Sequence, residues 1–167
     1  MNEILTKQLI LKPLQRDDDE NLFALHSDEQ VMKYIRKPDS DIFQTKKRIK
    51  EVMQYSFENP DLGLWCAFLK ESKEFVGWGV LVHIEHKQTN PVEVGFRLHQ
   101  KFWKKGFGFE IGSALINHAK DLGQKTIVGI TREDNIGSQK TLEKCGLQYI
   151  EDRIYYEQQV KYYEIKL

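Results

Sequence analysis

The stretch from Val92 to Leu122, VEVGFRLHQKFWKKGFGFEIGSALINHAKDL, decides the fold of this chain. Its first seven residues alternate between apolar side chains and polar or glycine positions, which is the period of a β-strand. After the Gly106-Phe107-Gly108 segment, apolar residues recur at the spacing of a helix: Ile111, Leu115, Ala119 and Leu122. The stretch therefore predicts a strand, a short basic turn with two glycines, and an amphipathic helix.

The turn has the properties of an anion-binding site. The N–H groups in the first turn of a helix have no partners within the helix, and the helix dipole favours a negative charge there. Gly106 and Gly108 let a ligand approach the backbone, and Lys104 and Lys105 add positive charge. The residues alone therefore predict a turn that binds phosphate.

Two common phosphate-binding motifs do not fit this turn. A Walker loop needs G-x-x-x-x-G-K-[ST], but the two lysines here precede Gly106. A dinucleotide fingerprint needs G-x-G-x-x-G, but counting from Gly106 the sixth position is Ile111, and Gly112 comes one residue too late. The turn therefore favours neither a kinase or ATPase nor a dinucleotide-binding protein.

The turn resembles the acetyl-CoA loop of the GNAT acyltransferases, whose pattern is Q/R-x-x-G-x-G/A. Trp103 stands where that pattern has Gln or Arg, but the GNAT branch that acetylates the N-termini of ribosomal proteins typically has Y/F-W-x-x-G-x-A/G-x-E. The residues that match this second pattern are Phe102, Trp103, Gly106, Gly108 and Glu110. In these enzymes the loop and the following helix hold the pyrophosphate of coenzyme A. The resemblance thus assigns cofactor binding to Trp103, Lys104, Lys105, Gly106, Phe107, Gly108 and Phe109.

A second segment carries the same resemblance. The residues from Thr126 to Thr131, TIVGIT, predict another strand, and Asn135-Ile136-Gly137-Ser138 supplies the N-x-x-S motif that follows the second central strand in this branch. The resemblance implies that Asn135 contacts the pantetheine arm and that Ser138 hydrogen-bonds the sulfur or relays its proton. Either residue could instead cap the following helix. Many GNAT members carry a tyrosine as general acid four residues before the next glycine, where this chain has Leu142.

The remaining chain predicts an α/β protein with a mixed sheet. Helices are expected to begin at Asp17–Asp19, at a capping box of Ser27 and Gln30, and at Ser40 or Asp41, the last of them ending at Asn59-Pro60. Further strands are expected at Gln8–Leu14, Leu64–Leu69, Glu74–Glu85, Gln148–Ile154 and Val160–Ile165. The resulting order, β-α-α-α-β-β-β-α-β-α-β-β, is the order expected of a GNAT fold.

The resemblance also implies how the central sheet is built. It should be mostly antiparallel, with flanking helices, and its two central strands, Glu93–Leu98 and Thr126–Thr131, should splay apart so that the acyl thioester enters between them. In the family a backbone N–H of the first of these strands is the donor to the thioester carbonyl, and the residues expected here are Phe96, Arg97 and Leu98. Residues 1–167 are expected to form one such acetyltransferase domain.

Acetyl transfer to an amine needs an unprotonated amine, a polarised carbonyl and a proton for the leaving thiolate. Because lysine-type amines titrate near ~10.4 and chain-terminal amines near ~7.7 to 8, the former need a general base far more. Glu93 on the central strand is the first candidate, followed by Glu85 and then His83, with His86 beside them. A histidine titrates near ~6.5, whereas a glutamate needs a raised pKa or a water chain. Each of these side chains could equally be structural or solvated.

Composition limits the other possibilities. Lys and Arg together number 25, as do Asp and Glu, so the net charge does not favour nucleic acid or an anionic membrane as a partner. No apolar run approaches the ~20 residues of a membrane span, and the N-terminus lacks the apolar region of a signal peptide, so we expect a cytoplasmic protein. Cys66 and Cys145 have no clustered partners, so they predict neither a disulfide framework nor a metal site.

The resemblance therefore implies an N-acetyltransferase. It would move an acetyl group from acetyl-CoA to a primary amine, either a protein N-terminal α-amine or a small molecule, by direct attack in a ternary complex. Two other classes stay open: a catalytically silent acyl-CoA-binding module, favoured by Leu142, and a protein-interaction domain that shares the fold. The edge of the closing hairpin is compatible with a homodimer.

Overall fold

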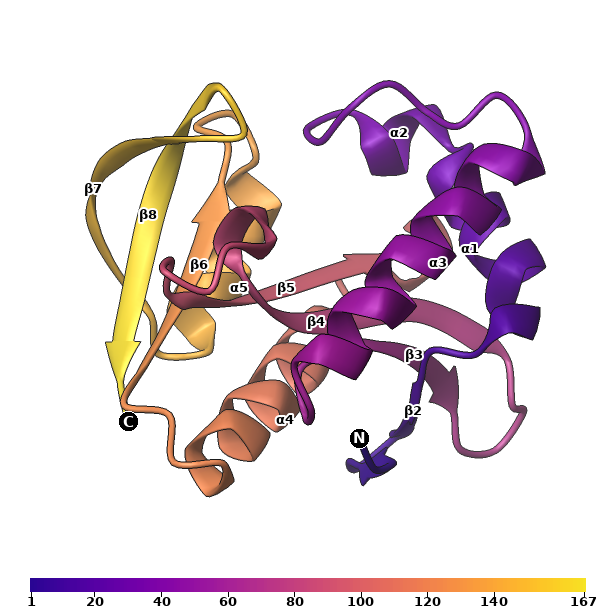
Figure 1. Cartoon of the computed structure of the whole chain (residues 1–167), viewed down its shortest axis with the longest axis horizontal. Helices are drawn as coiled ribbons and strands as arrows, with labels where there is room; N and C mark the ends of the chain where they lie inside the picture. Colours follow the sequence, from indigo (N-terminus) through magenta and orange to yellow (C-terminus); the bar gives the residue numbers. More distant parts are fainter.

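A computed structural model describes all 167 residues of the chain, which is organised around one eight-stranded sheet (Figure 1). The strands are β1 (Ile4–Leu5), β2 (Leu9–Pro13), β3 (Gly63–Leu69), β4 (Phe75–His83), β5 (Val92–Leu98), β6 (Thr126–Thr131), β7 (Gln148–Tyr155) and β8 (Gln158–Lys166). Their order across the sheet is β1-β2-β3-β4-β5-β6-β8-β7. Every neighbouring pair is antiparallel except β5 and β6, which are parallel. The predicted mixed, mostly antiparallel sheet is confirmed.

Helices cover both faces of this sheet. They are α1 (Asp19–His26), α2 (Glu29–Met32), α3 (Ile42–Glu58), α4 (Phe107–Asp121) and α5 (Ile136–Lys144). Adjacent residues of a strand point to opposite faces, so β4 shows which helix lies on which side. The Trp78 indole donates to His26 of α1, whereas a side chain at Gly79 would collide with Ile111 of α4. Hence α1 and α4 lie on opposite faces of the sheet.

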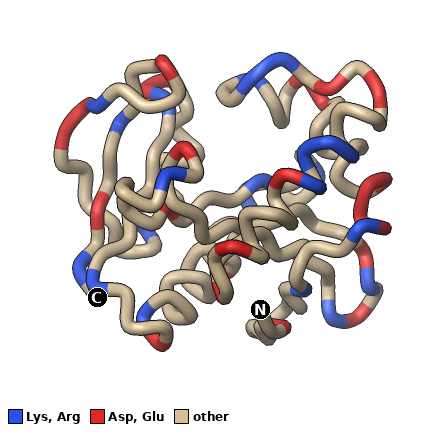
Figure 2. The backbone as a smooth tube through the Cα atoms, viewed as in Figure 1, with Lys and Arg blue, Asp and Glu red and all other residues tan.

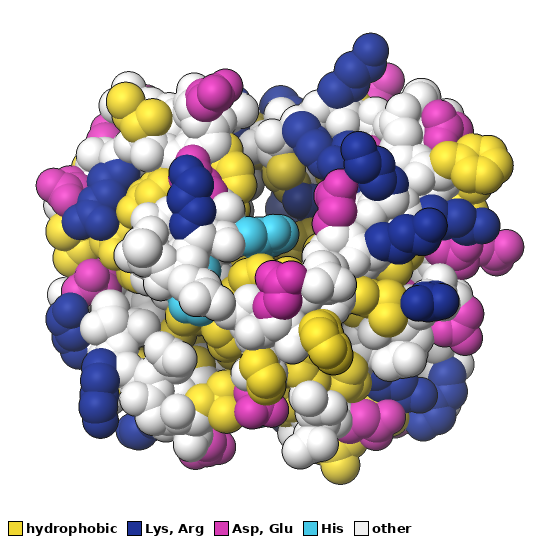
Figure 3. All heavy atoms as spheres, in the orientation of Figure 1, with side chains coloured by type: hydrophobic (Ala, Val, Ile, Leu, Met, Phe, Trp, Pro, Cys, Tyr) yellow, Lys and Arg dark blue, Asp and Glu magenta, His cyan; other side chains and the backbone are white.

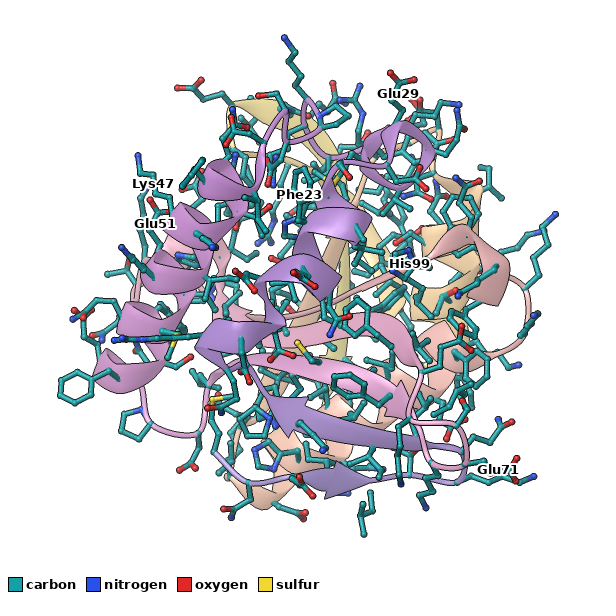
Figure 4. All side chains as sticks on the ribbon, turned by 90° about the vertical axis from the view of Figure 1, so that its right-hand side faces the viewer. Phe23, Glu29, Lys47, Glu51, Glu71 and His99 are labelled. Carbon is teal, nitrogen blue, oxygen red and sulfur yellow. The ribbon has the colours of Figure 1, made fainter.

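The hydrophobic core has one part on each side of the sheet. The larger part packs α4 against the strands and includes Ile111, Leu115, Ala119, Val94 and Leu81. The smaller part lies under α1 and α3 and includes Leu22, Leu25, Ile49, Leu64 and Trp78. Figure 4 looks onto this second layer, with Phe23 on α1 and with Lys47 and Glu51 on the outer surface of α3.

β5 and β6 separate soon after they meet. Only one pair of residues, Glu93 and Val128, is in register between them, at the start of β5. By contrast, β4 and β5 stay paired from Gly77–Leu98 to His83–Val92. The predicted splay of the two central strands is confirmed, and Figure 1 shows the wide angle between them.

The backbone of β5 leaves one set of polar groups free along this opening. The N–H of His99 donates to the carbonyl of Val76, and the N–H of Ile84 donates to the carbonyl of Pro91. Because hydrogen-bonding alternates along an antiparallel pair, the odd-numbered residues of β5 bond to β4. The even-numbered residues direct their N–H and C=O groups the other way, towards β6, which has already diverged at Phe96.

The start of the second helix differs from the prediction. Ser27 begins no helix; its N–H donates to the carbonyl of Phe23 at the end of α1. Asp28 caps α2 instead, because its carboxylate accepts from the N–H groups of Gln30 and Val31. The predicted capping box at Ser27 was therefore wrong by one residue.

Most other local predictions agree with the structure. Asp41 caps α3, which ends at Glu58 just before Asn59 and Pro60. Both cysteines are expected to be buried; Cys66 is fully buried, whereas Cys145 is only half-buried. None of the helices combines the length and the apolar character needed to cross a membrane.

Candidate active site

The glycine turn forms the start of α4. Gly106 has φ +88°, a left-handed conformation that suits glycine, and its carbonyl accepts the first bond of the helix from the N–H of Glu110. The N–H groups of the first turn, including Phe107, Gly108 and Phe109, are therefore left without intrahelical partners. No atom lies within 4 Å of the place where a side chain at Gly106 would begin, so the space above this turn is open to a ligand.

The neighbours of the turn supply charge and support. The predicted residues Lys104 and Lys105 are exposed and form no ion pair. Trp103 is 42% exposed, and its indole N–H donates to the carbonyl of Leu98 over 2.8 Å. Phe107 is buried beneath the turn. The structure thus brings these residues together at the end of β5, as the sequence predicts, with Trp103 joining the turn to that strand.

Glu110 anchors the start of α4 to the N-terminal strands. Its carboxylate accepts hydrogen bonds from the hydroxyl of Thr6, from the backbone N–H of Gln8 (2.6 Å) and from the amide of Gln8 (2.9 Å). Burial opposes the ionisation of Glu110, but these hydrogen bonds outweigh it and lower its pKa. The sequence matched Glu110 to a family pattern without giving it a role; the structure shows that it joins the glycine turn to the segment between β1 and β2.

The opening between β5 and β6 presents backbone donors beside this turn. Phe96 and Leu98 direct their N–H groups into it, and the Leu98 carbonyl is already taken by Trp103. The Phe96 ring packs on α4 next to Gly108. Arg97 differs from its two neighbours because its backbone faces β4 and its side chain lies on the α1 side of the sheet, over Trp78. Of the three residues predicted there, two face the opening.

α5 begins at the far side of the opening. Asn135 caps it, with its side-chain oxygen accepting from the N–H of Ser138 over 3.2 Å. The hydroxyl of Ser138 has no hydrogen-bond partner, so capping does not account for it. Leu142 is buried and packs on Gly129 of β6, so no polar side chain occupies the position of the family's tyrosine.

Glu93 lies at the point where the two central strands meet. It is half-buried and forms no hydrogen bond, and the loss of hydration raises its pKa to about 8. Tyr156, in the turn between β7 and β8, is close enough for the charge of Glu93 to act on it: burial and, next, Glu93 raise the pKa of Tyr156 to about 12. Burial thus raises the pKa of Glu93 into the range in which a carboxyl can exchange a proton near neutral pH.

Glu85 is held in a different way. Its carboxylate accepts from the ammonium of Lys87 and from the N–H of Tyr156, and these bonds lower its pKa. The predicted strand Glu74–Glu85 ends earlier, at His83, because residues 84–86 form a short turn with Glu85 at φ 56°. Glu85 therefore joins the end of β4 to the β7–β8 turn, whereas the Glu93 carboxyl has no hydrogen-bond partner.

A tyrosine from α3 joins the two predicted histidines. The hydroxyl of Tyr55 accepts from the backbone N–H of His83 and forms a second hydrogen bond, of 2.8 Å, with the Nδ1 of the same residue. The rings of Tyr55 and His86 lie 4.8 Å apart. Burial lowers the pKa of both histidines. Sequence reasoning missed Tyr55, since nothing in α3 signals a contact 28 residues away.

The molecular surface has a hollow beside α3. Figure 3 shows it between the part formed by α2 and α3 and the part formed by β6 to β8, with histidine side chains at its edge. Glu93 and Arg97 share the face of β5 that points to the α1 side, while Val92, Val94 and Phe96 point towards α4. The sheet thus separates this hollow from α4, and the opening between β5 and β6 connects the two sides.

Splayed central strands beside a glycine-led helix start are the architecture of the GNAT acyltransferases. A family model described as "Acetyltransferase (GNAT) domain" matches residues 8–148 of the chain. The chain therefore belongs to the GNAT acetyltransferase family.

Three known proteins show the extent of the similarity. FsC-acetyl coenzyme A-N(2)-transacetylase of Aspergillus fumigatus is 30% identical over 158 residues, covering 87% of this chain; the chain spans 65% of that relative's length. RimL, a ribosomal L7/L12 alpha-N-protein acetyltransferase solved with coenzyme A, has a TM-score of 0.83 at 15% identity, over 99% of this chain and 98% of that one. A GNAT-family acetyltransferase of Bacillus anthracis has a TM-score of 0.83 at 20% identity, over 98% of both chains. The two structures share the fold.

Proposed function

We propose that this chain transfers an acetyl group from acetyl-CoA to a primary amine, by direct attack of the amine in a ternary complex. The observation that carries this proposal is the opening between β5 and β6, where the N–H groups of Phe96 and Leu98 lie beside the free first turn of α4. The name of the fungal relative and the RimL structure, which both include coenzyme A, support the choice of donor.

The residues present fit this donor. The open space over Gly106, the free N–H groups of Phe107 to Phe109 and the unpaired Lys104 and Lys105 suit a pyrophosphate. The free edge of β5 and the side chain of Asn135 suit the amides of a pantetheine arm. Bound acetyl-CoA supplies the activated acetyl thioester.

Groups of the chain itself then accept the amine proton and stabilise the negative charge that develops on the thioester carbonyl oxygen. The N–H of Phe96 or Leu98 donates to the thioester carbonyl oxygen, which gains negative charge as the amine attacks. Glu93 takes the proton from the amine, directly or through a water molecule, because its carboxylate ionises near pH 8. The hydroxyl of Ser138, which has no other partner, hydrogen-bonds the leaving thiolate and relays a proton to it from solvent, since Leu142 cannot. Glu93 returns the amine proton to solvent, so the proton balance closes.

The acceptor is either a protein N-terminus or a small amine. The name of RimL specifies a protein N-terminus and that of the fungal relative an N(2) atom, so the acceptor differs among similar proteins. In this chain the acceptor enters from the hollow on the α1 side, because α4 and the cofactor turn cover the other side.

A second candidate function is an acyl-CoA-binding module without turnover. It is favoured by one observation, the buried Leu142 in place of the family's tyrosine. Release of coenzyme A in the presence of any amine removes this candidate.

The test combines binding and turnover. Ligand at 100 times its Kd stabilises the folded state by about 2.7 kcal/mol, which for a chain of this size raises Tm by about 5 to 10 °C. We expect that shift with acetyl-CoA and not with ATP or NAD, followed by amine-dependent thiol release. A shift without thiol release from any amine favours the binding module, and no shift refutes both candidates.

We also propose that two copies of the chain pair through β7. This strand forms the edge of the sheet, and Ile150 and Ile154 on it are 51% and 77% exposed. Its residues 149–155, YIEDRIY, have the same pattern in both directions about Asp152, so antiparallel pairing would place Glu151 opposite Arg153 of the second copy.

Charge reversal tests this pairing. Arg153→Glu places like charges opposite each other and should give monomers in sedimentation velocity. The double variant Glu151→Arg with Arg153→Glu restores opposite charges and should restore the dimer. A wild-type chain that sediments as a monomer, or a double variant no better than the single one, refutes the interface.

A further inference from the structure

Arg97 is a half-buried cation without an anionic partner. Its guanidinium lies 4.5 Å from the centre of the Trp78 ring, and its Nη1 lies 3.2 Å from the sulfur of Met32. Its Nε is buried and has no hydrogen-bond partner. A guanidinium has five N–H donors and usually meets a carboxylate or phosphate when it is withdrawn from water. Here that partner is missing.

The nearby carboxylate does not supply it. Asp39 is buried, and its oxygens accept from Arg36, Arg48 and the hydroxyl of Thr45. Although burial opposes it, these bonds lower the pKa of Asp39 to about 2. Two guanidinium groups thus share one carboxylate, and Arg97 adds a third positive charge nearby, so the region keeps a surplus of positive charge. Burial and then the charge of Arg36 lower the pKa of Arg97 to about 9, which still leaves it charged at neutral pH.

The other titratable neighbour does not change this balance. His26 accepts from Trp78 through Nε2, and its Nδ1 lies 3.7 Å from Asp39 without a hydrogen bond. Burial, followed by the charge of Arg97, lowers its pKa to about 3, so it is neutral. The surplus positive charge around Asp39 therefore comes from the arginines and not from His26.

The position of Arg97 connects this charge to the proposed reaction. Arg97 and Glu93 lie on the same face of β5, on either side of Gly95. A Cβ at Gly95 would lie 3.7 Å from Glu93 Oε1 and 3.0 Å from Val80, so the Glu93 carboxylate reaches over Gly95. Each is two residues from Gly95, about 7 Å along the strand. Two more basic residues, Lys33 and Lys37, come from the segment between α2 and α3 that also carries Arg36 (Figure 2), and Figure 3 shows basic side chains within the hollow.

We propose that Arg97 binds an anionic group on the acceptor, so that the substrate is an amine that also carries a carboxylate or similar anion. This inference rests on the proposed function, with the amine reacting over Gly95 and the anion about 7 Å further along β5. The same chemistry occurs in small amino acids with a spacer and in peptides with an acidic residue next to the N-terminal one. Acceptors with several positive charges, such as polyamines, are disfavoured by repulsion from the arginines.

Matched acceptors measure the effect. One series consists of ω-aminocarboxylates with four to eight carbons and their carboxamides, and the other of short amidated peptides with Glu or Gln at the second position. Loss of a hydrogen-bonded charge pair corresponds to about 10- to 100-fold in kcat/KM. We expect the wild-type enzyme to prefer the anionic member by this factor in at least one series. The series that shows the preference identifies the acceptor as a small molecule or as a peptide.

Substitution of Arg97 should remove the preference. In Arg97→Met the ratio of kcat/KM between the anionic and neutral members should fall to near 1, and Arg97→Lys should keep part of it. Arg16→Met is the matched control, because Arg16 is exposed on the turn before α1, and its ratio should equal that of the wild type. Arg97→Met should also have a higher Tm than the wild type, since an unpaired buried charge opposes folding; a structural arginine would give the reverse.

Binding without turnover separates this inference from the proposed function. Calorimetry with 6-aminohexanoate and 6-aminohexanamide on protein saturated with coenzyme A should show the same preference. Turnover of both members at equal rates refutes the anion site and leaves the acetyltransferase. Binding preference for the acid without any turnover keeps the anion site and refutes the acetyltransferase. If Arg97→Met does not fold, competitive inhibition of the wild type by hexanoate but not hexanamide supports the site, and equal effects refute it.

Discussion

Glu85 and Tyr156 hold each other through two reciprocal hydrogen bonds. The N–H of Glu85 donates to the Tyr156 hydroxyl (2.9 Å), and the N–H of Tyr156 donates to the Glu85 carboxylate (2.8 Å). The two residues are 71 positions apart, and the bonds join the end of β4 to the β7–β8 turn, where Tyr156 and Glu157 both have positive φ. This contact therefore holds Tyr156 where the charge of Glu93 acts on it.

Tyr156→Phe should loosen that contact. It leaves the N–H of Glu85 without its acceptor, which should lower the free energy of unfolding by about 1 kcal/mol in urea titrations. Better hydration of Glu93 should also lower the pH midpoint of kcat/KM. Tyr34→Phe is the control, since the Tyr34 hydroxyl forms no hydrogen bond; equal effects from both variants would contradict a role for the contact.

The pH dependence of activity and of stability should run in opposite directions at Glu93. Its folded-state pKa, about 8, lies above the ordinary glutamate value, so the neutral form is favoured by folding. Its contribution to stability is complete below the unfolded-state pKa and is lost as pH rises through about 8. Over the same range the carboxylate that accepts the proton appears, so kcat/KM should rise.

Glu93→Gln tests both parts. It should lower kcat/KM by about 10²- to 10⁴-fold and abolish the rise near pH 8. In urea titrations it should be relatively more stable than the wild type at pH 9 than at pH 6. A rise in rate that persists in Glu93→Gln would assign the titration to the amine itself.

Gly106→Val should abolish coenzyme A binding while the chain still folds. The substitution places a β-branched side chain in the open space over the cofactor turn and imposes a left-handed strain of about 1 to 2 kcal/mol. Gly123→Val is a close control, because Gly123 also has positive φ (+79°) and open space, but it follows α4 instead of preceding it. We expect similar losses of Tm from the two variants and loss of affinity only at Gly106; equal affinities would contradict the phosphate-binding turn.

Alanine variants of Asn135 and Ser138 should affect different properties, stability for Asn135 and turnover for Ser138. Asn135→Ala removes the cap of α5 and should lower the free energy of unfolding by about 1 kcal/mol. Ser138→Ala removes an unpartnered hydroxyl, so it should leave Tm nearly unchanged and lower kcat more than it raises KM for acetyl-CoA. A normal kcat in Ser138→Ala would leave the thiolate to be protonated directly by solvent.

Much of the fold could be predicted from the sequence because its signals are local. The strand at Thr126–Thr131 has the predicted bounds, and the strand, turn and helix from Val92 onwards follow the alternation of their apolar residues. β1 escaped prediction because a strand of two residues has no period. The start of α2 was misplaced because Ser27 and Asp28 are both good caps and only the backbone path decides between them.

The candidate site was predictable only where it is formed by contiguous residues. The glycine turn at the start of α4 and the cap at Asn135 are local, so their sequence patterns predict where they lie. Glu85 and Glu93 look alike in sequence; the structure distinguishes them because Tyr156 and Lys87 hold Glu85, whereas Glu93 has no partner. Such tertiary contacts leave no trace in a single sequence.

The attachment of Glu110 to Thr6 and Gln8 has a consequence for how the chain responds to its cofactor. The helix that would receive the pyrophosphate is fastened to the connection between β1 and β2, a hundred residues away in sequence. Linkage is reciprocal, so a ligand that steadies the start of α4 must also slow the opening of that connection. Amide hydrogen exchange at residues 6–9 should therefore report on occupancy of a site that these residues never touch.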